Sequence, residues 1–325
     1  MRHVDVAIIG GSLAGAACVR ELTRLGITAV AFERDLFPRD KVCGGFLSPG
    51  ATDLLDELGM LGAVRAAGAT TVRSSTISMH GRRVNVELPR PGLGVSRRVL
   101  DATMADHPGV ERAAVRDVQE SKDGFTVRLD GAQVRAKIVV DAAGKLSRFT
   151  ARRAVPQFGV QFYEKQSRGN VLDFSFFAEG YGGAVSVEGE RASACFLIFK
   201  DALPKFLERV GVRTEVLCTG PVAYDRLPSG FIAIGDAAGM IDPFCGEGMR
   251  HALDTGILAA RTIAGGLHRG DSYPSMRARY EQATAKRWRA KRRLGALIRY
   301  MLQHPRITSV GFRLKPEFWF RQLWA

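Results

Sequence analysis

Residues 4–34, VDVAIIGGSLAGAACVRELTRLGITAVAFER, decide the fold class of this chain. The stretch opens with a nearly continuous apolar run, Val4–Ile9, which is typical of a buried strand. A glycine-rich turn follows, then a segment with apolar residues at helical spacing, and then a second apolar run that ends at Glu33. This order predicts a βαβ unit of a Rossmann-like domain, whose glycine turn suits a dinucleotide.

Several positions in this unit match what a dinucleotide requires. Gly10 allows the tight turn, Gly15 allows close packing of helix on strand, and the helix N-terminus offers N–H groups to a pyrophosphate. Glu33 stands where a carboxylate can bind a ribose diol. Ser12 replaces the middle glycine of G-x-G-x-x-G, and the alternative is an ordinary βαβ unit with a glycine turn. The candidate cofactor-binding residues here are Gly10, Ser12, Leu13, Ala14, Gly15, Glu33 and Arg34.

Composition narrows the class of protein. The chain has 325 residues, enough to bury a sizeable core. Its five cysteines form neither a CxxC pair nor a Cys/His cluster. No metal site or disulfide framework is therefore expected, and a reducing, cytoplasmic location is favoured. No apolar run reaches the ~20 residues that a membrane-spanning helix needs.

A second stretch, residues 230–260, repeats the pattern of strand, turn and helix: GFIAIGDAAGMIDPFCGEGMRHALDTGILAA. We expect a strand over residues 231–234 and a helix from about Glu247. Asp236 follows the strand, where its carboxylate can hydrogen-bond a polyol. A tight loop with N–H groups facing a ligand at the helix start is predicted from Pro243, Gly246 and Gly248.

With both stretches in view, the chain resembles the FAD-dependent oxidoreductases of the glutathione-reductase-like fold. More narrowly, it resembles their geranylgeranyl reductase branch, whose relatives include flavin halogenases and aromatic hydroxylases. The resemblance rests on GGSLAG with Glu33, PRDKVCGGFLSP, GVSRRVLD and GDAAGMIDPFCGEGM. It implies FAD as the cofactor.

The resemblance also assigns roles to single residues. It places Asp236 at the ribityl chain and Arg97 near the cofactor phosphates. The loop at the pyrimidine end of the isoalloxazine would contain Pro243, Gly246, Gly248 and Met249. One departure favours the reductase branch: Ala143-Gly144 stands where aromatic hydroxylases carry Asp-Gly. The halogenase alternative is also less favoured, because no W-x-W-x-I-P stretch is present.

These pieces predict an α/β fold with a Rossmann-like FAD-binding domain that is split in sequence. We assign residues 1–64, 94–150 and 222–267 to that domain, residues 65–93 and 151–221 to an antiparallel substrate-binding sheet, and residues 268–325 to a basic helical C-terminal segment. Alternate phenylalanines between residues 174 and 199 would either make the substrate pocket apolar or serve as plain core. The glycine pair of YGGAV (181–185) indicates either a β-bulge or a place where another group comes very close to the strand.

The loop PRDKVCGGFLSPG, residues 38–50, should run beside the ring system of the flavin. Lys41, Cys43 and Gly44 are therefore candidate cofactor-binding residues, and the Gly44-Gly45 pair is explained by close backbone approach. Cys43 is either a small residue packed against the isoalloxazine or a thiol that donates a proton or forms a flavin adduct.

A flavin accepts or delivers a hydride at N5, so the protein must place a carbon beside N5 and move a proton. The candidate proton donors are Cys43, Tyr181, Glu247 and His251. Glu247 and His251 lie four residues apart and can pair on one helix face, with a structural pair on the helix surface as the favoured interpretation.

The working hypothesis is reduction, or the reverse desaturation, of a carbon–carbon bond in a hydrophobic isoprenoid or polyketide-like substrate. NAD(P)H or another compound would supply the electrons. The alternatives are a flavin monooxygenase or halogenase and, from another class, a nucleic-acid-associated flavoprotein.

The C-terminal part carries most of the net charge of +14. From Arg261 onward there are 15 Lys/Arg against 3 Asp/Glu. A helix with an apolar stripe through Trp288, Leu294, Ile298, Met301 and Leu302 is predicted here, followed by the ending FWFRQLW. This segment either binds an anionic membrane surface at the periphery or packs its stripe on the FAD domain, with the final aromatics closing the pocket. A nucleic-acid partner is the least favoured reading.

Overall fold

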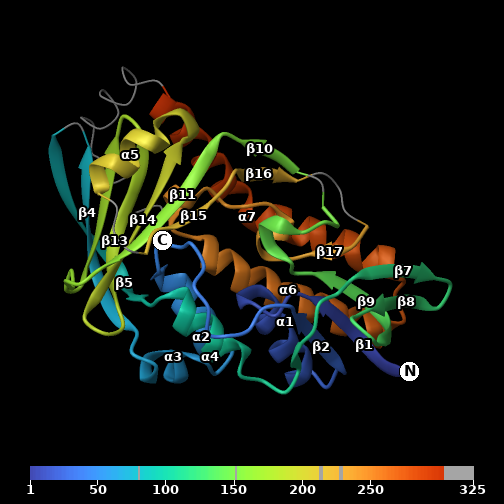
Figure 1. Cartoon of the computed structure of the whole chain (residues 1–325). Helices are drawn as coiled ribbons and strands as arrows, with labels where there is room; N and C mark the ends of the chain where they lie inside the picture. Colours follow the sequence, from blue (N-terminus) through green and yellow to red (C-terminus); the bar gives the residue numbers. More distant parts are fainter. Residues whose placement is uncertain (80, 151, 212–214, 227–229, 304–325) are drawn as a thin grey trace.

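The structure is a computed structural model, and it describes all residues except 80, 151, 212–214, 227–229 and 304–325. Figure 1 shows two sheets side by side, the first with the N-terminus and the second at the left of the view. Helices α6 and α7 run along the first sheet toward the second. The predicted fold class, an α/β FAD-domain architecture with a largely antiparallel second sheet and C-terminal helices, is confirmed.

The first sheet is seven-stranded, in the order β6-β2-β1-β9-β8-β7, with β17 paired to β9. Its strands β1, β2, β6, β9 and β17 pair in parallel, whereas β8 pairs antiparallel with β9 and with β7. The strands are β1 (Arg2–Ile9), β2 (Ala29–Glu33), β6 (Val110–Arg112), β7 (Asp117–Ser121), β8 (Gly124–Arg128), β9 (Gln133–Asp141) and β17 (Ile232–Ala233).

The second sheet is eight-stranded, in the order β15-β11-β14-β13-β12-β4-β5-β3, and only β12 and β4 pair in parallel. Its strands are β3 (Phe46–Leu47), β4 (Thr70–Met79), β5 (Arg82–Gly94), β11 (Gln157–Glu164), β12 (Val171–Phe177), β13 (Gly180–Val187), β14 (Arg191–Phe199) and β15 (Leu217–Thr219). A separate pair consists of β10 (Arg152–Val155) and β16 (Val222–Arg226).

The register of the second sheet explains the glycine pair of β13. Pairing runs without a shift from β12 through β13 to β14, so the pair makes no bulge. A Cβ on Gly182 would lie 2.3 Å from the Cys195 carbonyl oxygen, and one on Gly183 would lie 2.1 Å from that of Asp173. The backbone of neighbouring strands comes too close for a side chain at either position.

Helices cover one face of the first sheet. α1 (Leu13–Arg24) and α6 (Gly248–Arg269) approach so closely that a Cβ on Gly256 would lie 2.5 Å from the Ala14 carbonyl oxygen. The remaining helices and 3-10 turns are α2 (Pro49–Glu57), α3 (Leu61–Ala66), α4 (Arg97–Ala105), α5 (Leu203–Val210), η1 (Gly144–Leu146), η2 (Lys200–Ala202), η3 (Gly235–Ala238), η4 (Pro243–Cys245) and α7 (Tyr273–Gln303).

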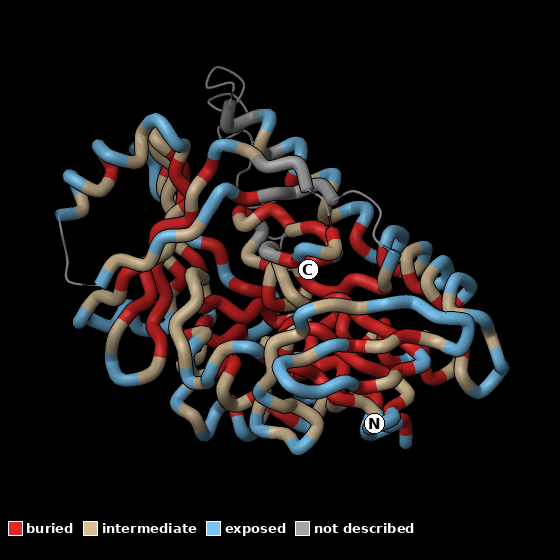
Figure 2. Tube along the Cα trace, turned by 45° about the vertical axis from the view of Figure 1, so that its right-hand side comes forward, coloured by how far each residue is buried: buried red, intermediate tan, exposed pale blue. Residues whose placement is uncertain are grey.

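Helix α7 packs onto the body of the protein (Figure 1). Tyr280 is 1% exposed and donates a hydrogen bond from its hydroxyl to the Ala233 carbonyl at 2.9 Å. Met276 and Trp288 are buried as well. Figure 2 shows buried residues concentrated between the helices and the two sheets, with exposed residues on outer loops, helix faces and strands such as β5 and β7. None of the helices in the described part of the chain has both the length and the apolar character that a bilayer crossing requires.

Candidate functional site

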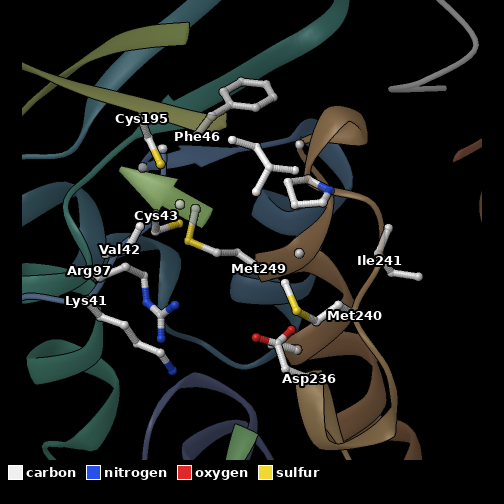
Figure 3. Close-up of a pocket in the computed structure, with 18 of the residues that line it drawn as sticks. Lys41, Val42, Cys43, Phe46, Arg97, Cys195, Asp236, Met240, Ile241 and Met249 are labelled. Carbon is white, nitrogen blue, oxygen red and sulfur yellow. The ribbon is translucent and has the colours of Figure 1, made fainter. Parts of the chain in front are cut away.

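A pocket of about 270 Å³ lies where the two sheets meet (Figure 3). Its wall combines the N-terminal ends of α1 and α6, the loop before β3, and strands β13 and β14 of the second sheet. Thirteen residues of the predicted site line it: Ser12, Leu13, Ala14, Lys41, Cys43, Gly44, Arg97, Tyr181, Asp236, Pro243, Gly246, Gly248 and Met249. Segments far apart in the sequence therefore form one cavity.

The turn between β1 and α1 has the predicted glycine geometry. Gly10 has φ of +105°, and a Cβ there would lie 2.5 Å from the Ala142 carbonyl oxygen. A Cβ on Gly15 would lie 1.9 Å from the Gly10 carbonyl oxygen. Glu33 is buried, and its carboxylate accepts a hydrogen bond from the Gly11 N–H at 3.0 Å. Gly10, Gly15 and Glu33 thus shape the turn from behind the pocket wall.

Arg34 follows Glu33 but lies on the surface. Its guanidinium is 3.6 Å from the Asp35 carboxylate, and its side chain is 65% exposed. It does not line the pocket, so its predicted part in cofactor binding stays a prediction.

A buried polar cluster joins α1 to α4. The Ser12 hydroxyl donates to Asp101 Oδ2 at 2.8 Å and accepts from Arg97 Nη2 at 2.9 Å. Arg97 also donates to both carboxylate oxygens of Asp101, at 2.8 and 2.9 Å, and Asp101 is fully buried. The serine that breaks the glycine pattern is therefore the residue that couples the turn to Arg97. Asp101 ends the stretch GVSRRVLD, but no role in the site was predicted for it.

Two further charges face the pocket beside this cluster. Lys41 and Asp236 point toward the space below Arg97 in Figure 3. Desolvation lowers the pKa of the Lys41 ammonium, and the neighbouring positive charge of Arg97 lowers it further. Within the described residues, this ammonium forms no hydrogen bond or ion pair. An anion bound here would be a partner for it.

The opposite end of the pocket is the loop that leads into α6. Gly246 has φ of +62° and ends the 3-10 turn η4, and α6 begins two residues later at Gly248. Apart from its chain neighbours and the backbone of its own helix, no described residue has an atom within 4 Å of a Cβ built on Gly248. Met249 is 5% exposed and packs in the core with its side chain toward the pocket (Figure 3). The helix N-terminus thus opens onto free space.

The loop of residues 38–50 forms the wall between these two ends. The Cys43 N–H donates to Gln161 Oε1 at 2.9 Å, and Gln161 Nε2 donates to Ser193 Oγ at 3.0 Å. Cys43 therefore sits on a buried polar support that the sequence did not reveal. Cys195 lies beside it in the pocket wall, and burial raises the pKa of the Cys195 thiol.

The glycine pair of this loop serves two purposes rather than one. A Cβ on Gly44 would touch only the Cys195 Cβ, at 3.9 Å. Gly45 has φ of +81°, and a Cβ there would lie 3.0 Å from the Val95 carbonyl oxygen. Only Gly44 leaves room toward the pocket, whereas Gly45 is dictated by its own backbone and by the packing behind it.

The predicted pair of Glu247 and His251 does not form. Both side chains are fully buried, so neither lies on a helix surface. The Glu247 carboxylate accepts from Ser48 Oγ at 3.1 Å and forms ion pairs with Arg250 and Lys291, both at 3.3 Å. Neither ring nitrogen of His251 has a hydrogen-bond partner among the described residues.

His251 instead packs edge-on against Trp288, with ring centroids 4.8 Å apart. Burial lowers its pKa to about 3, so the imidazole is neutral. Neither Glu247 nor His251 lines the pocket. The predicted pair was wrong because tertiary packing by α7 turned this part of α6 into core.

Tyr181 is different, because it does line the pocket and has an acidic partner. Its hydroxyl donates to Asp242 Oδ1 at 2.7 Å, and Asp242 Oδ2 accepts from Arg299 of α7 at 2.9 Å. Burial raises the pKa of Asp242, although hydrogen bonds from Tyr181 and from the Phe244 N–H oppose this. Asp242 was not among the predicted site residues, and its position directly before Pro243 was the only signal in the sequence.

The rest of the pocket wall is mostly apolar. Phe174 and Phe196 line it, whereas Phe177 lies outside it and stacks on Phe206, with centroids 5.8 Å apart, in a cluster that Phe196 also contacts. The alternate phenylalanines are thus divided between pocket and plain core. Lys145 and Thr219 add a polar contact on the far side, where the ammonium donates to the threonine hydroxyl.

Comparison with known proteins agrees with this geometry. Residues 3–156 match the family described as FAD binding domain. The chain is an FAD-dependent oxidoreductase. The flavoenzyme is 27% identical to the menaquinone reductase of Mycolicibacterium smegmatis over 81% of this chain and 77% of that protein. It is 24% identical to digeranylgeranylglycerophospholipid reductase 3 of Methanosphaera stadtmanae over 83% of this chain and 80% of the other.

Solved structures extend the similarity of fold to nearly the whole flavoenzyme. The flavin-dependent brominase Bmp2 superposes with a TM-score of 0.79, covering 99% of this chain and 93% of the brominase, at 20% sequence identity. The flavin-dependent brominase and this chain thus share one fold.

The pocket fits FAD, the ligand named by the family model that residues 3–156 match. Two helix N-termini open onto it, and Arg97 and the unpartnered Lys41 supply positive charge for a diphosphate. Asp236 presents a carboxylate for hydroxyl groups, and the open sides of Gly44 and Gly248 leave room for a flat ring. The roles of single residues toward FAD stay predictions.

Proposed function

We propose that this flavoenzyme reduces a carbon–carbon double bond of a hydrophobic, isoprenoid-like substrate, or desaturates the corresponding single bond in reverse. The observation that carries the proposal is the Tyr181 hydroxyl, hydrogen-bonded to buried Asp242 in the mostly apolar part of the pocket wall. Such a group can donate a proton where water is excluded.

The pattern of relatives supports a reductase. The two reductases named above match along more than four-fifths of this chain. By contrast, the match to 3-amino-4-hydroxybenzoate 2-monooxygenase PtnB3 of Streptomyces platensis covers 44% of it, at 31% identity. Among these relatives, sequence similarity beyond the FAD-binding part is to enzymes named menaquinone reductase and digeranylgeranylglycerophospholipid reductase.

The chain's residues would divide the work as follows. Bound FAD supplies hydride chemistry at N5 of its ring. Phe174, Phe196 and Leu197 hold the apolar substrate against that ring and exclude water. In the reductive direction Tyr181 would give its phenolic proton to the substrate carbon, and the phenolate would then be reprotonated by Asp242 in its protonated form, which takes up a proton from solvent before the next turnover.

The direction of the Asp242 pKa shift fits this relay. Because burial raises its pKa, the carboxyl holds a proton at a higher pH than an exposed aspartate does. The Arg299 ion pair on the other oxygen keeps the group in place as it changes charge. Electrons come from NAD(P)H or another donor, which the proposal leaves open.

The test is anaerobic reoxidation of the flavin. The FAD-loaded protein is reduced with dithionite and mixed with menaquinone or an unsaturated isoprenoid glycerophospholipid, while the visible flavin band and product mass are followed. We expect the band to return and the product, after any quinol is reoxidised in air, to retain two added hydrogens in its isoprenoid chain. Return of the band only with oxygen, with a hydroxylated or halogenated phenol as product, would overturn the proposal.

Tyr181→Phe removes the proposed proton donor, the hydroxyl, and keeps the aromatic ring in the pocket wall. Loss of the hydroxyl should slow reoxidation by substrate roughly 10²-fold or more, the usual contribution of a general acid, without changing FAD content. Tyr163→Phe is the matched control, because that phenol also bonds an aspartate, Asp40, but lies outside the pocket. Equal rates in the two variants would remove Tyr181 from the mechanism.

A further inference from the structure

We propose that the solvent-facing side of α7 is a docking surface for an anionic membrane. The surface consists of Lys286, Arg289, Arg293, Leu297 and Tyr300, here called the α7 stripe. The proposal does not depend on the substrate, since it concerns where the protein is held and not what it reduces.

The basic residues of α7 fall into two groups with different surroundings. One group faces the body and pairs with buried acids: Arg287 with Asp254 at 2.9 Å, Lys291 with Glu247 at 3.3 Å, and Arg299 with Asp242 at 2.9 Å. Together with Trp288, these contacts fix α7 on α6 and on the segment that leads into it. Much of the basicity of α7 is thus structural.

The second group is exposed, and no acid among the described residues forms an ion pair with it. Lys286, Arg289 and Arg293 are exposed, and none forms an ion pair or hydrogen bond with a described residue. Their spacing of three and four residues places them along one face of the helix. This face therefore carries positive charge that the fold itself does not use.

The same face ends in exposed apolar side chains. Leu297 is 47% exposed and Tyr300 is 53% exposed, and their positions continue the spacing of the stripe by four and three residues. A basic face with a leucine and a tyrosine beside it is typical of helices that lie in a membrane interface. A nucleic-acid surface would be expected to carry charge without the exposed leucine, which favours lipid.

The stripe lies on the back of the helix that holds one wall of the pocket. Arg292 donates to the carbonyl oxygens of Ala238 and Gly239, both at 3.4 Å, and Arg299 bonds Asp242. Between these contacts, Met240 and Ile241 line the pocket (Figure 3). A membrane bound to α7 would therefore lie next to the segment that borders the cavity.

The experiment is sedimentation of the full-length, FAD-loaded protein with lipid vesicles. Vesicles of phosphatidylcholine alone are compared with vesicles of phosphatidylcholine and phosphatidylglycerol in equal parts. We expect binding only to the anionic vesicles and release at about 0.5 M NaCl, where charges are screened within a few ångströms. No binding to anionic vesicles would overturn the proposal.

Two pairs of matched variants locate the surface. Lys286→Glu/Arg289→Glu/Arg293→Glu should lower vesicle partitioning at least tenfold, whereas Arg73→Glu/Arg82→Glu/Lys122→Glu, with the same charge change at exposed sites elsewhere, should bind nearly as wild type. Leu297→Ser should weaken binding and Leu36→Ser, at another exposed leucine, should not.

The remaining outcomes are as decisive. Equal loss in the stripe and control variants would mean that net charge, and not this face, attracts the vesicles, and the proposal would fall. Preferential binding of an RNA oligonucleotide that anionic vesicles fail to displace would also overturn it. FAD absorbance and thermal unfolding verify that each variant is folded, so failure here is separate from failure of the reductase assay.

Discussion

Trp288 of α7 donates a hydrogen bond from its indole Nε1 to Oδ2 of Asp254 in α6, at 2.8 Å. Arg287, the preceding residue, forms an ion pair with the other oxygen of the same carboxylate at 2.9 Å. Burial raises the pKa of Asp254, and these two partners oppose that effect. The carboxylate therefore ties α7 to α6 and depends on α7 for its charge.

This contact should contribute strongly to stability. Trp288→Ala removes a side chain that is 3% exposed and leaves the acid with one partner, so the free energy of unfolding should fall by about 3–5 kcal/mol. Trp288→Phe keeps most of the packing and loses the hydrogen bond, at about 1–3 kcal/mol. Urea unfolding followed by circular dichroism measures both. A loss under 0.5 kcal/mol for the alanine variant would show that α7 is not part of the core.

Arg97 and Asp101 should separate stability from cofactor binding. Arg97→Met leaves the fully buried Asp101 without its charge partner, which should cost about 3–5 kcal/mol. Adding Asp101→Leu removes the stranded carboxylate and should restore most of that stability. Neither variant restores the positive charge in the pocket, so FAD affinity, measured by fluorescence quenching, should stay low in both. Recovery of FAD affinity in the double variant would show that Arg97 acts only through the fold.

Alanine substitutions at the adjacent glycines Gly44 and Gly45 should affect different properties, FAD binding in one case and stability in the other. Gly45→Ala forces a side chain into a positive φ and against the Val95 carbonyl, so unfolding should become easier by about 1–3 kcal/mol. Gly44→Ala places its methyl on the pocket side, and the free protein should keep its stability while FAD binding weakens by about 1–3 kcal/mol. Thermal unfolding without FAD and FAD titration distinguish them. Identical behaviour of the two variants would contradict the assigned orientation of the loop.

The buried His251 should make the stability of the folded protein depend on pH. Its pKa is about 3 in the folded protein and near 6.5 when unfolded, so below pH 6.5 the unfolded chain binds a proton that the folded protein does not. Stability should therefore fall with pH from about 6.5 toward 3, by up to about 1.4 kcal/mol per pH unit from this residue.

Replacement by Phe isolates that contribution. His251→Phe retains a ring against Trp288 and removes two unpartnered nitrogens, so it should stabilise the protein by about 1 kcal/mol at pH 7. The stability difference between variant and wild type should widen at pH 5. A difference that is constant from pH 7 to pH 5 would mean that the imidazole is protonated in the fold.

Local sequence rules predict the backbone conformation of the site but not the contacts of its side chains. The strand, glycine turn and helix of residues 4–34 follow from hydrophobic period and turn chemistry, as does the loop before α6. Gly10 and Gly15 could be assigned because the constraint on each is a clash with nearby backbone. These features are confirmed by the fold, and FAD as the cofactor is confirmed by the family match.

Side-chain partners between distant elements could not be predicted in the same way. Nothing in helical spacing indicated that Glu247 would pair with Ser48 and Lys291, since those residues come from 199 positions earlier and 44 positions later. His251 became core because α7 covers it. The role of Asp242 depends on a tertiary contact, because it is β13 that places Tyr181 within hydrogen-bond distance of its carboxylate.

The residues that match the FAD binding domain, 3–156, form only part of the pocket, because Asp236 and the loop into α6 lie far beyond them. During synthesis, the fingerprint turn leaves the ribosome more than two hundred residues before Gly248. The growing chain should therefore pass most of its translation with a half-built flavin cleft, and cofactor capture should coincide with the docking of α6 against α1. Supply of FAD late in translation, and not at its start, would then limit how much of the enzyme matures.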